Sequence, residues 1–380
     1  MSIRAFAAHL GVAVASVTNW EQRGEMIRLR DETQEILDRD LSRATEEVRS
    51  RFAAALDADQ MISGRLPRDG AQRLEYVLAN PGSVDLVTVA HLREQVAALD
   101  AQYDRAPAAA LLGIVGERHG QIMFLRTHAT RSRVLRDLNA AAAESATLMG
   151  QLLWDASMRR DNATALAYLD QAVDAAGECG DPIAAGRAQL RRSYVAIYGQ
   201  KDPAAGAQMA TQAAATSRSN SNVLAGLALL HAAEAHAMRQ QRRPCERLLR
   251  AAEGHFGKVD SQDEASLLFS PVDLSRMAGS CYLSLGDANQ ATRFLSDTLS
   301  TAGRTKAAAV AAANLSLAYI QQHAVSAAVH SLHQAIDITE STRGGGGLTV
   351  AFTAGRALSP WRNTAEVQDV QDRLLTLMAA

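Results

Sequence analysis

The side chains with the most informative spacing lie in residues 3–24, and the chemistry they suit is recognition of DNA rather than bond making. The apolar pattern predicts one helix over about 2–10 and a second over about 14–23. Gly11 falls between them, where a tight turn favours a residue that tolerates positive φ. This spacing is the one that a DNA-reading helix-turn-helix requires.

Four residues set the packing of this helix pair. Ala7 is small enough to let the second helix approach, Gly11 makes the turn, and Val17 and Trp20 close the core. At these positions the segment resembles the phage-repressor and Cro-like (XRE) helix-turn-helix family, whose pattern is a small residue, a turn glycine, an aliphatic residue and a bulky apolar residue. An ordinary helical hairpin is the alternative interpretation.

The resemblance implies that the second helix lies in the major groove of double-stranded DNA, with its outward side chains at the base edges. Asn19 then suits a two-pronged contact to adenine, and apolar side chains suit a thymine methyl group. The alternative for each polar residue is a solvated helix face. The implied DNA-contacting residues are Val14, Ala15, Ser16, Thr18, Asn19, Gln22, Arg23 and Arg28, of which the last three suit the phosphate backbone.

The charge and the start of this head bear on how it would bind. Residues 1–52 hold eight arginines and nine acidic residues. Since phosphate neutralisation supplies most non-specific affinity, one head should bind DNA weakly, and we expect a homodimer on a two-fold operator.

Repressor-like domains also have a scaffold helix before the pair, whereas here Met1 stands directly before it. Either the true start lies upstream or the head is cut down, and we favour the first.

Composition sets the fold class. The 380 residues are 47% hydrophobic and only 4% aromatic, with eight prolines and a net charge of −2, which predicts an all-α protein. The cysteines lack the paired spacing of a zinc ribbon or a disulfide framework, so we expect reduced thiols in a cytoplasmic protein; they are Cys179, Cys245 and Cys281. No apolar run is long enough for a membrane span, and no secretory signal or cofactor motif is present.

The order of segments predicts four parts. Residues 1–56 form the helix-turn-helix head, 57–70 a linker, 71–132 a helical connector, and 133–380 a superhelix with C-terminal capping helices. In the connector, Ser83 is expected to cap a long helix.

From residue 133 onward, helices recur in pairs. Segments 271–303 and 304–340 carry matching small and large residues at an offset of 37, as from Tyr282 to Tyr319 and from Ala291 to Ala328. Both segments resemble tetratricopeptide repeats, whose period is about 34. Weaker units cover 146–178, 182–218 and 222–257, and a final pair, 346–358 and 363–379, caps the array. The resemblance implies an α-solenoid.

Such a superhelix would use its first helices to line a concave groove that binds an extended peptide or encloses a small ligand. Arginines there suit a carboxylate, and Asn314 suits a peptide backbone. The alternative is an exposed polar residue or, for the tryptophan, a core filler. Helical geometry predicts that the groove is lined by Trp154, Arg192, Arg276, Ser280, Leu283, Asn314 and Gln321.

Features of enzymes are few. His330 and His333 have helical spacing and Glu340 follows, but a metal site needs a third convergent ligand that the sequence does not place, so we expect a solvated face. The run 344–347 is all glycine but lacks the Gly-Lys-Ser/Thr of a phosphate loop, so we expect a flexible hinge. With no serine elbow, paired catalytic carboxylates or nucleotide fingerprint, we expect no enzyme and no bound metal.

A repressor-like head followed by a tetratricopeptide array resembles bacterial one-chain regulators, among them the RRNPP group and the alanine-rich regulators of actinomycetes. The resemblance implies a transcriptional regulator whose array senses a peptide, small ligand or protein partner and sets the spacing of two heads on an operator. The alternative is a cytosolic tetratricopeptide scaffold or adaptor whose degenerate head no longer binds DNA.

Overall fold

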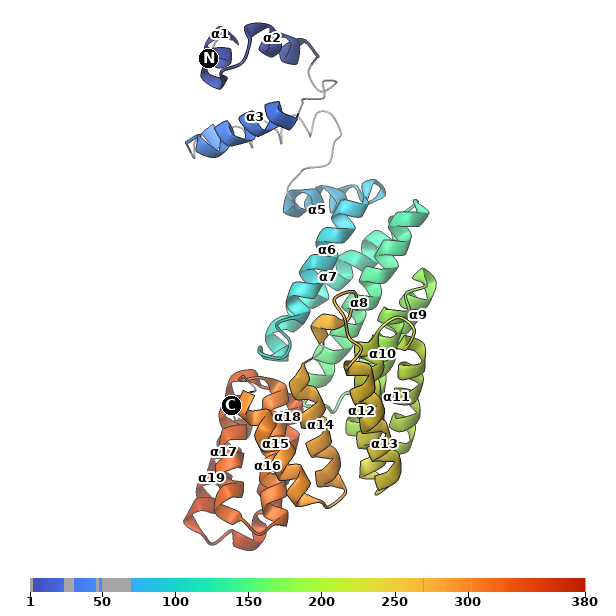
Figure 1. The fold of residues 1–380 in the computed structure, drawn as a ribbon, viewed down its shortest axis with the longest axis vertical. Coiled ribbons are helices and arrows are strands. Elements are labelled where there is room, and N and C mark those ends of the chain that lie inside the picture. Colours follow the sequence, from blue (N-terminus) through green and yellow to red (C-terminus); the bar gives the residue numbers. More distant parts are fainter. Residues whose placement is uncertain are drawn as a thin grey trace. The chain divides into compact units, whose positions relative to one another are not determined.

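The computed structural model describes residues 3–23, 31–45, 48–49, 70–268, 270–301 and 303–379. Within these ranges every regular element is a helix, which confirms the predicted all-α class (Figure 1). The chain divides into two compact units, residues 1–76 and 77–380. The four-part division stays a prediction, and of its linker only Gly70 lies among the described residues. No helix in the described ranges is long and apolar enough to cross a membrane.

The first unit begins with the two helices that the sequence predicts, α1 (Ile3–Leu10) and α2 (Val14–Arg23), followed by α3 (Asp31–Arg43). Gly11 makes the turn between α1 and α2 with a φ of +71°, and the Val12 N–H donates to the Ala7 carbonyl oxygen at 3.0 Å. This left-handed residue closes α1, as glycine does at many helix ends. His9 and Asp40 join α1 to α3 through a 2.7 Å contact between the His9 Nε2 and a carboxylate oxygen.

Helix α5 (Gly70–Ala79) spans the division between the units, and α6 (Leu86–Asp100) and α7 (Ala108–His128) open the second unit. The cap of α6 differs from the prediction. Asp85 accepts the Thr88 N–H at 2.9 Å, while the Ser83 hydroxyl donates to the Asn80 carbonyl oxygen in the preceding turn. Asp85 stands at the N-cap position, where its carboxylate satisfies a free amide of the first turn.

In the described part of the second unit, the remaining α-helices form consecutive pairs, the first of which begins at Ser132, well before the predicted unit 146–178. Each first helix packs against the second helix of its pair. The pairs are α8 (Ser132–Ala156) with α9 (Asn162–Cys179), α10 (Pro182–Tyr194) with α11 (Pro203–Ser217), α12 (Asn222–Met238) with α13 (Arg242–Phe256), α14 (Pro271–Ser284) with α15 (Ala288–Thr301), α16 (Lys306–Gln321) with α17 (Val325–Thr342), and α18 (Gly345–Ala357) with α19 (Ala365–Ala379).

Small residues let the two helices of a pair approach closely. A Cβ atom at Gly279 would lie 2.5 Å from Leu295 Cγ on the partner helix, so only glycine fits without displacement. In α16 the equivalent position is Ser316, whose hydroxyl donates to the Ala328 carbonyl oxygen at 2.8 Å. Other first helices use glycine in the same way, at Gly150, Gly186, Gly226 and Gly355.

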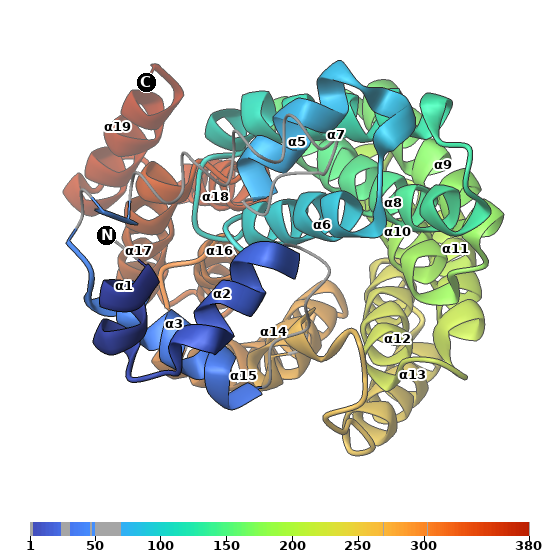
Figure 2. The ribbon, with the colours of Figure 1, turned by 90° about the horizontal axis from the view of Figure 1, so that it is seen from above.

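The first helices also contact one another in order, and the last of them, α18, contacts α8 again (Figure 2). The Gly345 N–H donates to Asp155 Oδ1 at 2.8 Å, and Asp155 Oδ2 lies 2.9 Å from Lys306 Nζ. These contacts close the first helices into a ring. The expected glycine hinge is therefore wrong: residues 344–347 are buried, and a Cβ at Gly345 would lie 2.9 Å from the Asp155 carbonyl oxygen.

Candidate functional site

The first candidate surface is the outward face of α2. Val14, Ala15 and Asn19 are exposed, whereas Ser16 and Thr18 are half-buried and the Thr18 hydroxyl donates to the Val14 carbonyl oxygen at 3.0 Å. The remaining predicted contacts cannot be placed: the side chains of Gln22 and Arg23, and the whole of Arg28, lie outside the described residues.

The opposite face of α2 packs on α1. Ala7 is fully buried and Val17 is 5% exposed, while Trp20 is half-buried. The small side chain at Ala7 lets the two helices meet, as the sequence predicts. Because this face carries the packing, the face of Asn19 stays in contact with solvent.

The second candidate site is a polar cluster on the first helices of the ring. Packing of these helices against one another does not require charged side chains. It joins α10, the π-helical turn Val195–Gly199 that follows it, α12 and α14, together with the segment after α8. We call it the interior cluster; its residues are Arg159, Arg191, Tyr194, Tyr198, His231, Glu234 and Arg276.

A hydrogen-bonded chain lies at its centre. The Tyr198 hydroxyl lies 2.8 Å from His231 Nδ1 and also contacts a carboxylate oxygen of Glu234. With Glu234 ionised, Tyr198 donates to it and the protonated Nδ1 of His231 donates to Tyr198. The Tyr194 ring packs on the His231 ring at a centroid distance of 3.9 Å. These contacts fix the orientation of the imidazole.

Burial and the nearby arginines determine the protonation of this chain. Burial lowers the pKa of His231 well below its usual value, and the charges of Arg276, Arg191 and Arg159 lower it further. Burial raises the pKa of Glu234, against the stabilising hydrogen bond from Tyr198. Each shift disfavours the charged form, as removal from water does. His231 is therefore neutral at pH 7.

Aromatic rings hold two of the arginines. The Arg159 guanidinium lies 4.7 Å from the ring centroid of Trp154 and 5.8 Å from that of Tyr198. The Arg191 guanidinium lies 5.0 Å from the Tyr194 centroid. These distances are within the range of cation–π attraction.

Of the predicted groove residues, four lie in or beside the interior cluster. Arg276 pairs with Asp273 at 3.1 Å, and Ser280 lies beside Glu234. Asn314 extends the network by donating to the Ser280 hydroxyl at 2.7 Å. Trp154, 5% exposed, contributes its ring face to Arg159.

The other three predicted groove residues lie elsewhere. Arg192 pairs with Asp170 of α9 at 2.9 Å, and Leu283 is buried in an apolar core with Leu295. The Gln321 side-chain amide donates to the Leu283 carbonyl oxygen at 3.4 Å. These contacts direct Arg192 and Leu283 away from the interior cluster, because packing against a neighbouring helix sets the rotation of each helix.

Sequence reasoning did not single out most of the interior cluster. A signal was present: Tyr194 and Tyr198 are four residues apart, and His231 and Glu234 are three apart on a helix otherwise rich in alanine and leucine. Polar residues at helical spacing on such a helix meet on one face. The π-helical turn that carries Tyr198 is not visible in the sequence, although such turns often mark functional sites.

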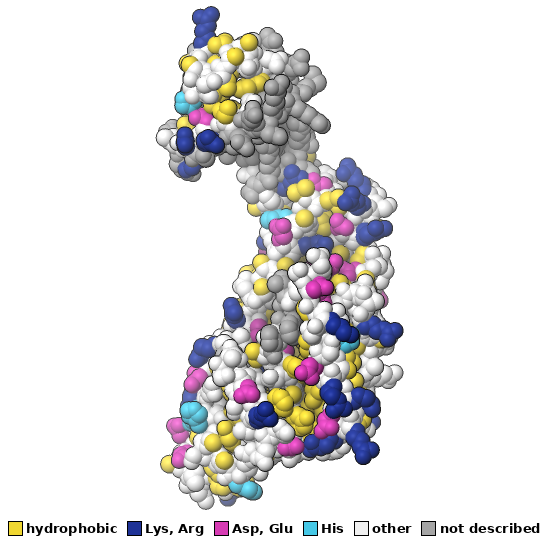
Figure 3. Space-filling model, in the orientation of Figure 1, with side chains coloured by type: hydrophobic (Ala, Val, Ile, Leu, Met, Phe, Trp, Pro, Cys, Tyr) yellow, Lys and Arg dark blue, Asp and Glu magenta, His cyan; other side chains and the backbone are white. Residues whose placement is uncertain are grey.

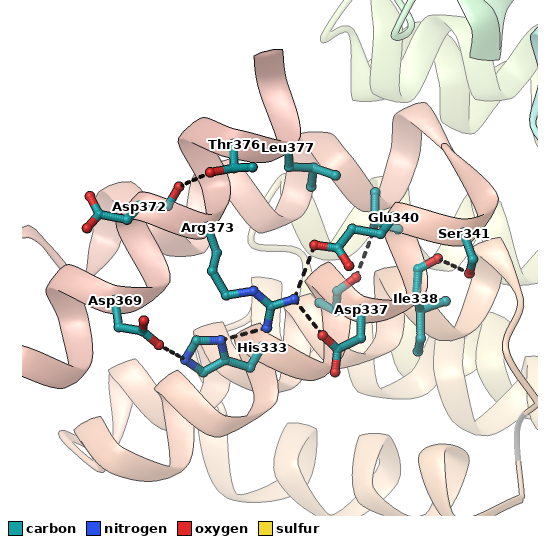
Figure 4. A network of polar contacts seen from close by, with 12 residues as sticks. His333, Asp337, Ile338, Glu340, Ser341, Asp369, Asp372, Arg373, Thr376 and Leu377 are labelled. Atoms are coloured by element: carbon teal, nitrogen blue, oxygen red, sulfur yellow. Dashed lines mark hydrogen bonds and ion pairs between the residues drawn. The ribbon is translucent and has the colours of Figure 1, made fainter. Parts of the chain in front are cut away.

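Of the two histidines that the sequence raised as metal ligands, His330 is exposed and His333 has other partners (Figure 4). His333 Nδ1 lies 3.0 Å from Arg373 of α19, and its Nε2 lies 3.4 Å from Asp369. The same guanidinium pairs with Asp337 at 2.6 Å and Glu340 at 3.2 Å. This network joins α17 to the last helix, and no group of potential metal ligands occurs in the described ranges.

Two of the cysteines meet in space although they are distant in sequence. Cys245 of α13 and Cys281 of α14 are fully buried in one apolar core as free thiols. Contact with Cys245 and burial raise the pKa of Cys281 well above its usual value. The same contact lowers the pKa of Cys245, so the two thiols act as a hydrogen-bonded pair within the apolar core.

The geometry thus gives two separate candidates, an exposed helix face in the first unit and a positively charged interior cluster in the second. Comparisons with protein-family models and with curated proteins find no match to this chain.

Proposed function

We propose that this chain is a DNA-binding transcriptional regulator, with a Cro-like helix-turn-helix in α1–α2 and a tetratricopeptide-like second unit that senses a ligand. The observation that carries the proposal is the division of α2 into two faces. One face packs on Ala7 through Val17, and the other leaves Val14, Ala15 and Asn19 in solvent. A helix with one supported face and one free face is what major-groove binding needs.

The proposed contacts follow from the chemistry of the free face. The major groove is wide enough to admit an α-helix. An asparagine there can accept from the N6 amino group of adenine through its side-chain oxygen while its amide N–H donates to N7. Asn19 is therefore the adenine-reading residue of this proposal. Val14 and Ala15 pack against thymine methyl groups. Two heads in a homodimer would read the two halves of an operator, because one near-neutral head gains little from phosphate contacts.

The second unit supplies the sensing half of the proposal. Its ring of first helices is closed by contacts between residues far apart in sequence, so a ligand that touches several of these helices can favour one arrangement of the ring. Such a ligand changes DNA affinity by the same factor by which DNA changes ligand affinity. The ligand class is a peptide or small molecule recognised by the interior cluster.

DNA binding is tested with the full chain and labelled duplexes from the chromosomal region upstream of its own coding sequence, by electrophoretic shift at 50 and 200 mM salt. We expect the parent chain to shift at least one fragment, and less of it at the higher salt concentration. The Asn19→Ala variant should bind that fragment about 1–3 kcal/mol more weakly than the parent. Asn363→Ala, which changes an exposed asparagine of the second unit, is the matched control and should bind as the parent does. A random-duplex selection extends the search to other operators. Failure to shift or select any duplex would refute the regulator and favour the scaffold alternative.

A further inference from the structure

We propose that the interior of the second unit binds a small oxyanion, a carboxylate or a phosphate, between Arg159 and Arg191. This inference deepens the sensing half of the proposed function by naming the chemical class of the ligand. It depends on residues of the ring alone, so it is tested without DNA.

Arg159 and Arg191 differ from the other half-buried arginines of this unit. No carboxylate within the described ranges lies at ion-pair distance from either guanidinium. Every other half-buried arginine described in residues 77–379 has an acidic partner at 3.1 Å or less; these are Arg93, Arg118, Arg126, Arg187, Arg192, Arg276 and Arg373. The two remaining guanidinium groups keep their donors available for a bidentate oxyanion.

Both arginines are held in place before any ligand arrives. Arg159 lies over the rings of Trp154 and Tyr198, and Arg191 lies over that of Tyr194. The Tyr194 and Tyr198 centroids are 6.1 Å apart, so the two cation–π pairs adjoin each other. A ligand that binds preorganised groups loses less side-chain freedom. The aromatic faces also suit a ligand that carries a planar ring beside its anionic group.

Arg159 lies near other positive groups as well as near the carboxylates of Asp155 and Glu234. A Cβ at Gly346 would collide with the Arg159 guanidinium, so this cation lies against the first turn of α18. The first turn of a helix carries free amide N–H groups and the positive end of the helix dipole. Arg159 and Arg191 both act on His231, whose pKa their charges lower. Half-buried guanidinium groups are screened less by water than exposed ones, so they attract an anion more strongly.

A buried amide offers further polar contacts. Gln151 is 5% exposed and lies on α8 one turn before Asp155, the residue that caps α18. Its side chain interacts with the Tyr103 hydroxyl, and within the described residues it has no other polar partner. A buried amide has two N–H donors and an oxygen acceptor, so one interaction with Tyr103 leaves an N–H group from which an oxyanion would accept.

The arginines on the outside of the unit lack these features. In Figure 3, Lys and Arg side chains gather around α13, where Arg243, Arg247 and Arg250 are exposed. Water and salt screen exposed charges, and Arg242 beside them is paired with Asp287 at 3.3 Å. The interior pair is therefore the stronger candidate for a specific anion.

The test is isothermal titration of the full chain, without DNA, with sodium benzoate and separately with inorganic phosphate at constant ionic strength. We expect saturable binding of at least one probe. Arg159→Gln and Arg191→Gln should each weaken it about tenfold or more, since each removes a charged hydrogen-bond donor. Tighter binding of benzoate would identify an aromatic carboxylate as the source, and tighter binding of phosphate a phosphorylated compound.

Arg192→Gln is the matched control, because this neighbour of Arg191 on α10 is paired with Asp170 of α9. It should keep the parent dissociation constant. Arg159→Lys and Arg191→Lys preserve the charge and should lose less affinity than the glutamine variants, and far-UV circular dichroism checks that each variant folds. Absence of saturable binding of both probes to the parent chain would overturn the proposal. Equal affinities of the parent and both glutamine variants would do the same, while neither result would bear on DNA binding by α2.

Discussion

Replacing Lys306 by methionine removes the ammonium group that helps to close the ring while keeping most of the apolar stem. Lys306 Nζ lies 2.9 Å from Asp155 Oδ2 and 4.0 Å from the ring centroid of Tyr103. The side chains of Lys306 and Asp155 are only 7% and 1% exposed. The substitution therefore leaves a buried carboxylate with one partner fewer.

Removing one partner of a buried ion pair costs about 3–5 kcal/mol. Asp155 still accepts the Gly345 N–H through its other oxygen, so we expect the lower end, a loss of about 3 kcal/mol in the free energy of unfolding. Urea unfolding followed by far-UV circular dichroism at pH 7.5 measures this loss. The exposed Lys258→Met is the control and should stay within about 0.5 kcal/mol of the parent.

A double variant separates the charge from the packing. Asp155→Asn keeps a side-chain oxygen that can accept the Gly345 N–H but has no charge to leave unpaired. Asp155→Asn with Lys306→Met should be more stable than the sum of the two single losses predicts, by at least about 1 kcal/mol. Loss of less than 1 kcal/mol in Lys306→Met, with additive behaviour in the double variant, would refute the claim that this pair holds the ring closed.

Three further predictions concern the same unit. Because the pKa of His231 is lower in the folded than in the unfolded protein, the unfolded chain binds more protons below about pH 6.5, and this contribution to stability is lost as the pH falls. His231→Gln should therefore reduce the loss of urea stability between pH 7 and pH 5, by up to about 1.4 kcal/mol per pH unit, whereas the exposed His330→Gln should not. Gly279→Ala should lower the free energy of unfolding by about 1–2 kcal/mol, because overpacking against Leu295 exceeds the gain in helix propensity; an unchanged urea midpoint would contradict the close approach. Arg373→Met should cost about 1 kcal/mol or less, because its ion pairs are partly exposed, and should speed hydrogen exchange in α19; unchanged exchange there would show that the network does not hold the last helix.

The helices of this protein follow from local sequence. Apolar periodicity placed α1 and α2 within a residue or two of their observed ends, and Gly11 has the positive φ that its turn position predicts. The helix pairs of the second unit were also predictable, since glycines and alanines recur where paired helices touch. Each of these features depends on residues that are close in sequence.

The ring closure and the interior cluster depend on contacts that local patterns do not encode. Asp155 and Gly345 are 190 residues apart, so no spacing rule connects them. The rotation of each first helix is set by its neighbours on both sides, and α12 is buried on nearly all its faces. Its apolar pattern therefore did not indicate which way the side chains of His231 and Glu234 point. For the same reason the sequence could not show that Arg192 faces α9 rather than the interior.

The most direct test of the proposed function is fluorescence anisotropy of the full chain with one selected duplex and with a scrambled duplex of the same length and composition. The account predicts that Asn19→Ala weakens binding to the selected duplex by about 1–3 kcal/mol while leaving its weak affinity for the scrambled duplex unchanged. Equal affinity of the parent chain for both duplexes, or equal binding of the selected duplex by parent and variant, would contradict sequence reading by the exposed face of α2.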